Sequence, residues 1–187
     1  GDVVLVTHVH HYDPDGIRRV AAPDATLVVP TGMDVGSTDR TAERPVALDY
    51  EVVALGCEDE AVLAGTPLWT VHAYNEPSGP RTDRAGEPIH PKGRGVGYLF
   101  EVAGTRVFVP GDTDVLAGHA ELDVDLFLPP IGGTFTMDRE EAAGLAGALD
   151  PGLVVPVHYN TFAAIETDDR AFAADVAERG VPVALDR

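Results

Sequence analysis

Nine short apolar runs, each about five residues long and bounded by turn residues, constrain the fold of this chain most strongly. Runs of this length that are rich in Val, Leu and aromatic residues are typical of strands. Gly104-Thr105 lies between two of them and predicts a tight hairpin turn. The runs lie at 2–6, 26–30, 51–55, 68–74, 96–102, 106–110, 125–130, 153–158 and 181–185.

Two later segments have the pattern of amphipathic helices. In residues 138–150, Asp138 can cap the first turn with Glu141 three residues on, and apolar side chains recur on one face. Residues 168–180 begin with acidic side chains and end at Gly180, as helices often do. Strands combined with these helices predict an α/β fold, and we expect one domain over residues 1–187.

One long segment, residues 76–95, has neither pattern, because it holds four prolines and four glycines. A structureless loop of this length inside a compact domain is usually functional or mobile. We see no internal repeat and no linker between domains.

The charge of the chain excludes several classes of partner. The net charge is -18, the pI is about 4.5, and Lys92 is the only lysine. Such a charge disfavours nucleic acid and anionic membranes as partners. An acidic surface with almost no lysine indicates adaptation to high salt, where screening weakens repulsion, although an acidic protein from an ordinary habitat would also fit.

Other compositional features point to a cytoplasmic protein. No apolar run is long enough to span a membrane, and no leader sequence argues for secretion. Cys57 is the only cysteine, which excludes an internal disulfide and a cysteine-rich metal site.

The stretch "THVHHYDPDG" at residues 7–16 is the first candidate for chemistry. On an extended segment His8 and His10 point the same way, which makes them half of a zinc site. Asp13 is close enough in sequence to join them or to orient one of them. The alternative is three solvent-exposed loop histidines, with His11 as the third.

Two further strands carry polar residues at their ends. Asp112 follows the run 106–110 on a glycine turn, and His158 ends the run 153–158. Sites in α/β proteins are commonly built from such loop positions along one sheet edge. Alone, Gly-Asp is also ordinary turn chemistry, and His158 could be a core histidine. We predict that His8, His10, Asp112 and His158 converge within reach of one metal site.

Taken together, the motifs T-H-x-H, "VFVPGDTD", "HPKGRGVGYLFEV", "LPPIGGTFTMDREEAA" and "VVPVHYNTF" resemble the metallo-β-lactamase superfamily of hydrolases. They look most like its L-ascorbate-6-phosphate lactonase-like branch. The resemblance implies a four-layer αββα sandwich with a one- or two-metal site at one edge.

The chain departs from the family pattern in three places. The pattern T-H-x-H-x-D-H loses two residues here, so that His11 takes the last histidine position and the usual aspartate has no counterpart. The family also has an N-terminal β region, so we expect a sandwich without those first strands or one completed by a partner. Third, Asn75 stands where related sequences have a histidine. We expect His90 to supply that ligand, with His72 as the second choice, and we expect His119 to lie on the surface.

The resemblance implies a role for each residue. His8, His10 and His90 would hold one metal, Asp112 would bridge, and His11 and His158 would hold the second. Asp13 is the nearest replacement for the missing catalytic aspartate. Lys92 and Asn160 are candidates for binding substrate, although both could be ordinary loop residues. The metal is expected to be zinc, one or two ions, with manganese or iron as alternatives.

The leading hypothesis is therefore a hydrolase in which metal-bound hydroxide attacks a small ester, lactone or phosphodiester. The alternative is a catalytically impaired metal- or ligand-binding domain of the same fold, suggested by the lost aspartate. A nuclease of the superfamily is disfavoured by the net charge. A small-molecule substrate is the expected partner, and the prediction allows a homo-oligomer.

The charge yields a first testable prediction. With 31 acidic and 13 basic side chains, repulsion should destabilise the folded state at low ionic strength. We expect the melting temperature, followed by circular dichroism, to climb steadily as potassium chloride is raised into the molar range. A flat or falling melting temperature would contradict adaptation to high salt.

Overall fold

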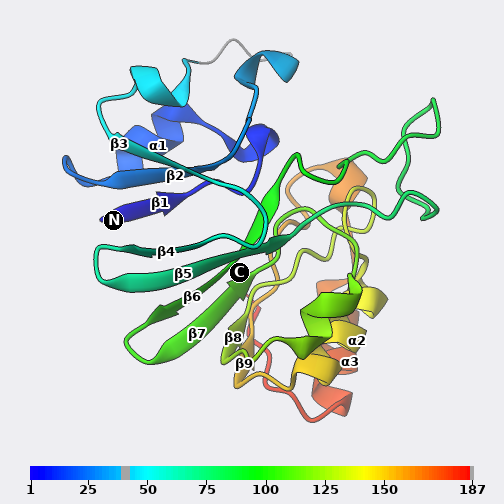
Figure 1. Ribbon diagram of the computed structural model, residues 1–187. Coiled ribbons are helices and arrows are strands. Elements are labelled where there is room, and N and C mark those ends of the chain that lie inside the picture. The colour runs from blue at the N-terminus through cyan, green and yellow to red at the C-terminus, as the bar shows by residue number, and fades with distance from the viewer. Residues whose placement is uncertain (39–42, 186–187) are drawn as a thin grey trace.

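The computed structural model describes residues 1–38 and 43–185. These residues form two sheets that face each other, with helices on the outer sides (Figure 1). The first sheet is parallel and its strands lie in chain order, β1 (Val3–Leu5), β2 (Thr26–Pro30) and β3 (Glu51–Leu55).

The second sheet has six strands that also lie in chain order. The first four are antiparallel neighbours, whereas the last two pair in parallel. They are β4 (Glu60–Leu63), β5 (Thr66–His72), β6 (Val96–Val102), β7 (Thr105–Val109), β8 (Leu126–Phe127) and β9 (Leu153–Val154).

Three α-helices and five short 3-10 turns complete the described chain. The α-helices are α1 (Pro14–Val20), α2 (Arg139–Leu149) and α3 (Asp169–Glu178). The 3-10 turns are Val9–His11, Val35–Ser37, Pro45–Ala47, Ala117–Glu121 and Ala163–Ile165. None of the described helices has the length and apolarity needed to cross a membrane.

Alternating side chains along the strands build the layers. On β2, Leu27 and Val29 pack with Ile17 of α1, whereas Val28 packs toward the other sheet with Leu68 and Tyr98. A third core fills the space between the second sheet and the helices α2 and α3. The order of layers is therefore α1, first sheet, second sheet, then α2 and α3, which is the predicted αββα arrangement.

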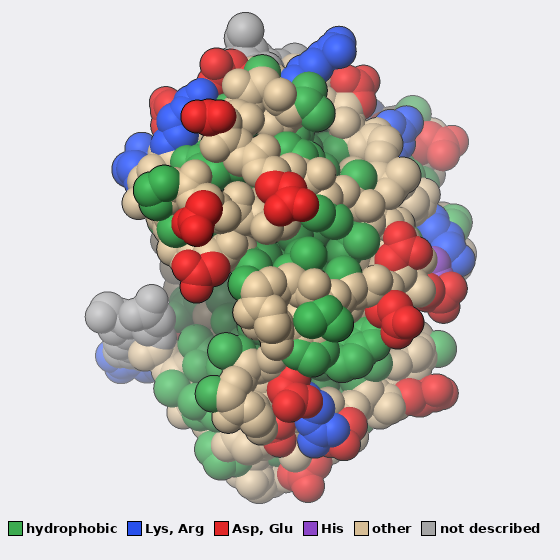
Figure 2. All heavy atoms as spheres, turned by 60° about the vertical axis from the view of Figure 1, so that its left-hand side comes forward, with side chains coloured by type: hydrophobic (Ala, Val, Ile, Leu, Met, Phe, Trp, Pro, Cys, Tyr) green, Lys and Arg blue, Asp and Glu red, His purple; other side chains and the backbone are tan. Residues whose placement is uncertain are grey.

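The face at the left of Figure 1 carries hydrophobic side chains at its centre, with many carboxylates around them (Figure 2). A shallow groove on the molecule is lined by residues of β1, the β4–β5 hairpin and the end of β6. The scattered carboxylates agree with the acidic composition of the chain.

The helix predictions at 138–150 and 168–180 are confirmed with small shifts at their ends. The Asp138 carboxylate accepts from the backbone N–H groups of Glu140 and Glu141, and the Glu141 side chain accepts from the N–H of Asp138. This is the expected capping box. The helix α1, which Asp13 caps and Pro14 begins, was not predicted.

Three strand predictions need correction. Residues 181–185 form a single bridge to β9 at Val183 and no strand, because Pro182 has no N–H to donate to a ladder. The strand β4, which is short and lies at the sheet edge, was missed. The hairpin turn lies one residue earlier than predicted, at Ala103 and Gly104, which both have positive φ.

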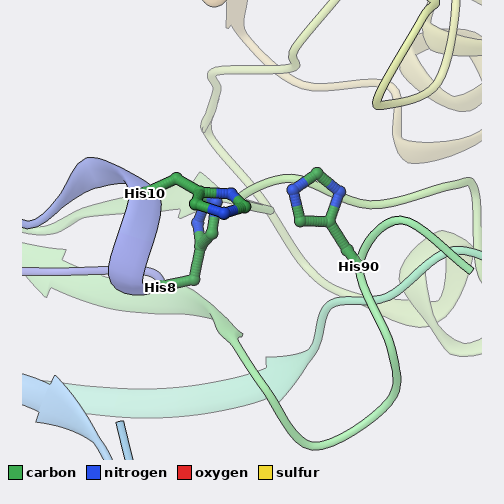
Figure 3. Close-up of side chains that lie close together, drawn as sticks. All are labelled: His8, His10 and His90. Atoms are coloured by element: carbon green, nitrogen blue, oxygen red, sulfur yellow. The ribbon is translucent and has the colours of Figure 1, made fainter. Parts of the chain in front are cut away.

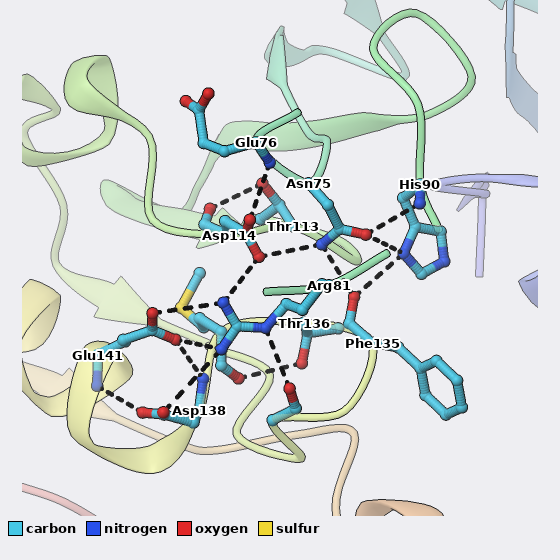
Figure 4. Close-up of polar contacts among 12 residues, drawn as sticks. Asn75, Glu76, Arg81, His90, Thr113, Asp114, Phe135, Thr136, Asp138 and Glu141 are labelled. Atoms are coloured by element: carbon cyan, nitrogen blue, oxygen red, sulfur yellow. Dashed lines mark hydrogen bonds and ion pairs between the residues drawn. The ribbon is translucent and has the colours of Figure 1, made fainter. Parts of the chain in front are cut away.

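The proline-rich segment 76–95 is irregular, as expected, but a buried ion network anchors it (Figure 4). Arg81 is 5% exposed, donates to the Asp114 carboxylate at 3.0 Å and to the Gly133 carbonyl, and pairs with Glu141 of α2. Asp114 also accepts from the N–H of Glu76 and from the Asn75 amide. The segment 76–95 is therefore held against α2 and against the loop that carries Asp112.

This network predicts a large stability loss when its cation is removed. Arg81→Met leaves the Asp114 carboxylate buried without its charged partner, which costs about 3–5 kcal/mol. Urea unfolding should show this loss, whereas Arg84→Met, an exposed arginine in the same segment, should stay within about 0.5 kcal/mol of the parent. Equal stability of the two variants would contradict a stabilising role of the ion network at Arg81.

Candidate metal centre

The first group of histidines follows β1, where the chain turns sharply. His8 is extended and bridges to Gly95, and residues Val9–His11 then form a 3-10 turn. The turn brings the ring centres of His10 and His11 to 5.1 and 4.6 Å from that of His8. The sequence pattern predicts an extended segment with two histidines on one side. The turn instead gathers all three rings at one place.

A single buried carboxylate lies at the centre of the cluster. Asp112 follows β7 after Gly111, a glycine with a φ of 72°. The Asp112 residue is only 7% exposed. Its Oδ2 lies 3.6 Å from the His8 Nε2, 3.5 Å from the His90 Nε2 and 3.3 Å from the His158 Nε2. The His11 Nε2 lies 3.7 Å from its Oδ1.

His90 reaches the cluster from the end of the segment 76–95, opposite His8 and His10 (Figure 3). Its Nδ1 lies 3.2 Å from the Asn75 Oδ1 and 3.1 Å from the Phe135 carbonyl oxygen. A carbonyl oxygen only accepts, so Nδ1 carries the proton and donates. The lone pair of His90 is then on Nε2, the nitrogen that faces Asp112.

His158 comes from the far end of the chain, after β9, and adopts a left-handed φ of 55°. The backbone there is close to Gly132, where an added Cβ would lie 2.7 Å from the His158 carbonyl oxygen. Only glycine fits at that contact, so Gly132 allows the turn that directs His158 to the site.

Burial and local charge set the protonation of these groups. Burial lowers the pKa of His8 to about 3 and also lowers the pKa of His90. Burial alone would raise the pKa of Asp112, but the hydrogen bond with His158 and the nearby imidazoles hold it well below its usual value. The hydrogen bond to Asp112 raises the pKa of His158. At neutral pH the cluster thus offers neutral His8 and His90 imidazoles and an ionised carboxylate, the forms that bind metals.

The donor atoms fit a metal ion. Two groups of side chains, His8 with His10 and His90, and His8 with His11 and Asp112, each hold ligand atoms within 4.8 Å of one another. The buried Nε2 of His8 has no hydrogen-bond partner in the described chain, which is costly unless an ion completes it. Imidazole and carboxylate ligands of this kind suit zinc.

The three remaining candidates lie elsewhere. Asp13 caps α1 by accepting from the N–H of Asp15 and belongs to neither ligand group. Lys92 has its Nζ 5.3 Å from the centre of the Tyr74 ring. The Asn160 side chain accepts from the N–H of Thr167, where it stabilises a local turn.

The two other histidines do not join the cluster. His72 lies in β5, and its Nε2 is 3.9 Å from Glu58. The expectation that His119 lies on the surface is wrong. It is 2% exposed, its Nδ1 accepts from the N–H of Leu116, and its Nε2 lies 3.0 Å from the His72 carbonyl oxygen. Burial lowers its pKa.

A cavity of about 260 Å³ opens beside the cluster. Two roles in this region were not predicted from the sequence, that of Arg94 at the cavity and that of Asn75 as the hydrogen-bond partner of His90. The motif "HPKGRG" contains both Lys92 and Arg94, and no sequence pattern distinguishes the two cations. The cavity is lined by Thr7, His8, Val9, His10, Ser37, Ala73, Ile89, His90, Pro91, Arg94, Gly95, Val96 and Asp112.

Comparison with known proteins identifies the family of this chain. A family model described as "Beta-lactamase superfamily domain" matches residues 1–158. A UPF0173 metal-dependent hydrolase of Thermus thermophilus is 32% identical over 185 residues, covering 96% of this chain and 75% of the relative. Another from Anaeromyxobacter sp. is 33% identical over 201 residues, covering 98% and 71%.

Solved structures agree with the fold. A crystal structure of a metal-dependent hydrolase from Parabacteroides distasonis aligns with a TM-score of 0.77 at 25% identity, covering 99% of this chain and 76% of that one. A metallo hydrolase from Ignicoccus hospitalis aligns with a TM-score of 0.75 at 24% identity, covering 100% and 76%. The predicted superfamily is confirmed, while the lactonase-like branch stays a prediction. The chain belongs to the beta-lactamase superfamily and, within it, to the UPF0173 metal-dependent hydrolases.

Proposed function

We propose that the cluster binds one or two zinc ions and that the enzyme hydrolyses a small ester, lactone or phosphodiester. The observation that carries this proposal is the convergence of imidazoles from distant segments on one buried carboxylate. Manganese or iron would also accept these ligands. The proposed ligands are His8, His10, His11, His90, Asp112 and His158.

The proposed ligands divide between two ions. His8, His10 and His90 would hold the first ion, and Asp112 with His11 and His158 would hold the second. A bound divalent ion would polarise the scissile bond and lower the pKa of a coordinated water to about 7. The ionised carboxylate of Asp112 lies between the two groups of histidines and would be a ligand shared by both ions.

Residues around the ligands keep them in place. The Asn75 Oδ1 accepts from the backbone N–H of His90 at 2.9 Å and faces its Nδ1, while the Asn75 amide donates to Asp114 and to the Phe135 carbonyl (Figure 4). This pattern fixes both the backbone and the ring of His90. Such partners typically change metal affinity by about 10- to 100-fold when removed.

A second candidate function, an impaired metal-binding domain, has one observation in its favour. The aspartate that normally follows the second histidine has no counterpart, and Asp13 is engaged as a helix cap. We therefore expect the second metal site to be weaker than the first. His11 nevertheless points toward Asp112 instead of away from it, so the second site keeps three candidate ligands.

The setting of the enzyme is also a proposal. The net charge of -18 supports a small-molecule substrate and argues against nucleic acid or an anionic membrane. A single cysteine supports a reducing cytoplasm. The proposal allows a homo-oligomer.

Metal titration tests the ligand assignment. Isothermal titration of the metal-free protein with zinc should give one tight equivalent and a second that is weak. His8→Ala should weaken the first equivalent, because His8 is one of its three proposed ligands, whereas His11→Ala should affect the second alone.

His72→Ala serves as the control, since it removes a histidine outside the cluster. Two equally tight equivalents in the parent would contradict unequal sites. An unchanged first site in His8→Ala would contradict the ligand set. A panel of esters, lactones and phosphodiesters, run with zinc-loaded parent and with Asp112→Asn, then tests hydrolysis, and the variant should fall to the level of the metal-free protein.

Asn75 gives a separate prediction. Asn75→Ala removes one of the two oxygens that face the His90 Nδ1, and the acceptor of its backbone N–H, so zinc should bind about 10- to 100-fold more weakly at the first site. Calorimetry measures the affinity, and thermal melting of the metal-free variant shows whether it is folded. A folded Asn75→Ala protein with parental zinc affinity would exclude a positioning role.

A further inference from the structure

We propose that Arg94 binds an anionic group of the substrate. The enzyme would then act on small esters or lactones that carry a carboxylate or a phosphate on an apolar body. This inference rests on the proposed hydrolase function and deepens it, because it names a substrate class and a residue that selects it.

The backbone holds Arg94 next to the histidine cluster. Gly95 bridges to His8, the N–H of Val96 donates to the Thr7 carbonyl at 2.9 Å, and the N–H of Arg94 donates to the Pro91 carbonyl. A Cβ added at Gly95 would lie 2.9 Å from the His8 Cβ, so the two backbones approach as closely as glycine permits. Arg94 thus directly precedes Gly95, the residue whose backbone contacts the proposed ligand His8.

The residues that line the cavity are of three kinds. His8, His10, His90 and Asp112 are the proposed metal ligands among them. Val9, Ala73, Ile89, Pro91 and Val96 are apolar. Arg94 supplies the one cationic side chain among the described residues that line the cavity, apart from the histidines. A ligand that fits all three has a reactive bond, an apolar body and an anion.

The charge available at the cavity differs from that of the chain as a whole. In a chain with 31 acidic and 13 basic side chains, an anion meets mostly repulsion at the surface. Arg94 has no carboxylate partner within the described part of the chain, so its guanidinium is available. The planar guanidinium donates two parallel hydrogen bonds to a carboxylate or phosphate.

Lys92, the earlier candidate for this role, is placed differently. Its ammonium lies over the Tyr74 ring, and it is not among the residues that line the cavity. Of the two cations in "HPKGRG", Arg94 is the one at the proposed site.

The test compares two esters that differ only in charge at one end. Monomethyl glutarate carries a carboxylate where methyl valerate has a methyl group. Calorimetry with the metal-free protein measures the binding of each, so that coordination to zinc does not contribute. In the parent protein we expect monomethyl glutarate to bind at least about tenfold more tightly, as a single charge-assisted pair can provide.

Variants assign the preference to one side chain. Arg94→Gln should bring the ratio of the two dissociation constants close to one, and Arg94→Lys should restore part of it. Arg84→Gln, which removes an exposed arginine outside the cavity lining, should keep the parental ratio. Equal binding of the two esters by the parent, no measurable binding of either, or an unchanged ratio in Arg94→Gln would each overturn the proposal.

Hydrolysis is measured separately, with zinc-loaded parent in a pH-stat. If neither ester is hydrolysed while the charge preference in binding persists and depends on Arg94, the hydrolase proposal fails for these esters and the assignment of Arg94 stands. If both esters are hydrolysed but bind equally well, the assignment of Arg94 fails and the hydrolase proposal stands.

Discussion

The Asp112 carboxylate, buried among imidazole rings, is the interaction on which the organisation of this protein depends. A buried carboxylate is costly unless cationic or hydrogen-bonding groups surround it. Here His8, His90 and His158 each direct a nitrogen to its Oδ2 from a different segment of the chain. The strands deliver these segments to one edge of the sandwich, and a divalent cation is the natural complement to the group.

A second buried charge lies close by and has a different task. Asp114 is two residues beyond Asp112, and Arg81 neutralises it with a hydrogen bond at 3.0 Å. Asn75 connects the two regions, because it contacts Asp114 on one side and His90 on the other. The ion network therefore holds the part of the segment 76–95 that carries His90, the proposed ligand.

Much of this architecture could be predicted from the sequence because apolar periodicity and helix caps are local signals. Eight of the nine apolar runs mark strands closely enough to give the layers, whereas the ninth, 181–185, forms only a bridge at Val183. The convergence of Asp112 with His158 followed from their positions after strands. The burial of His119 and the contacts of Arg94 could not be predicted, because both depend on packing between segments far apart in the sequence.

The proposed ligands come from both sheets, and this has a mechanical consequence. His8 follows a strand of the first sheet, whereas Asp112 and His158 follow strands of the second. The distances between them therefore depend on how the two sheets pack, through the backbone bridge of His8 to Gly95 and through the apolar side chains of Val28, Leu68 and Tyr98. A small shear of one sheet against the other would separate the donor atoms. Core residues remote from the cluster thus act as determinants of its geometry, and repacking them would tune metal affinity without touching a ligand.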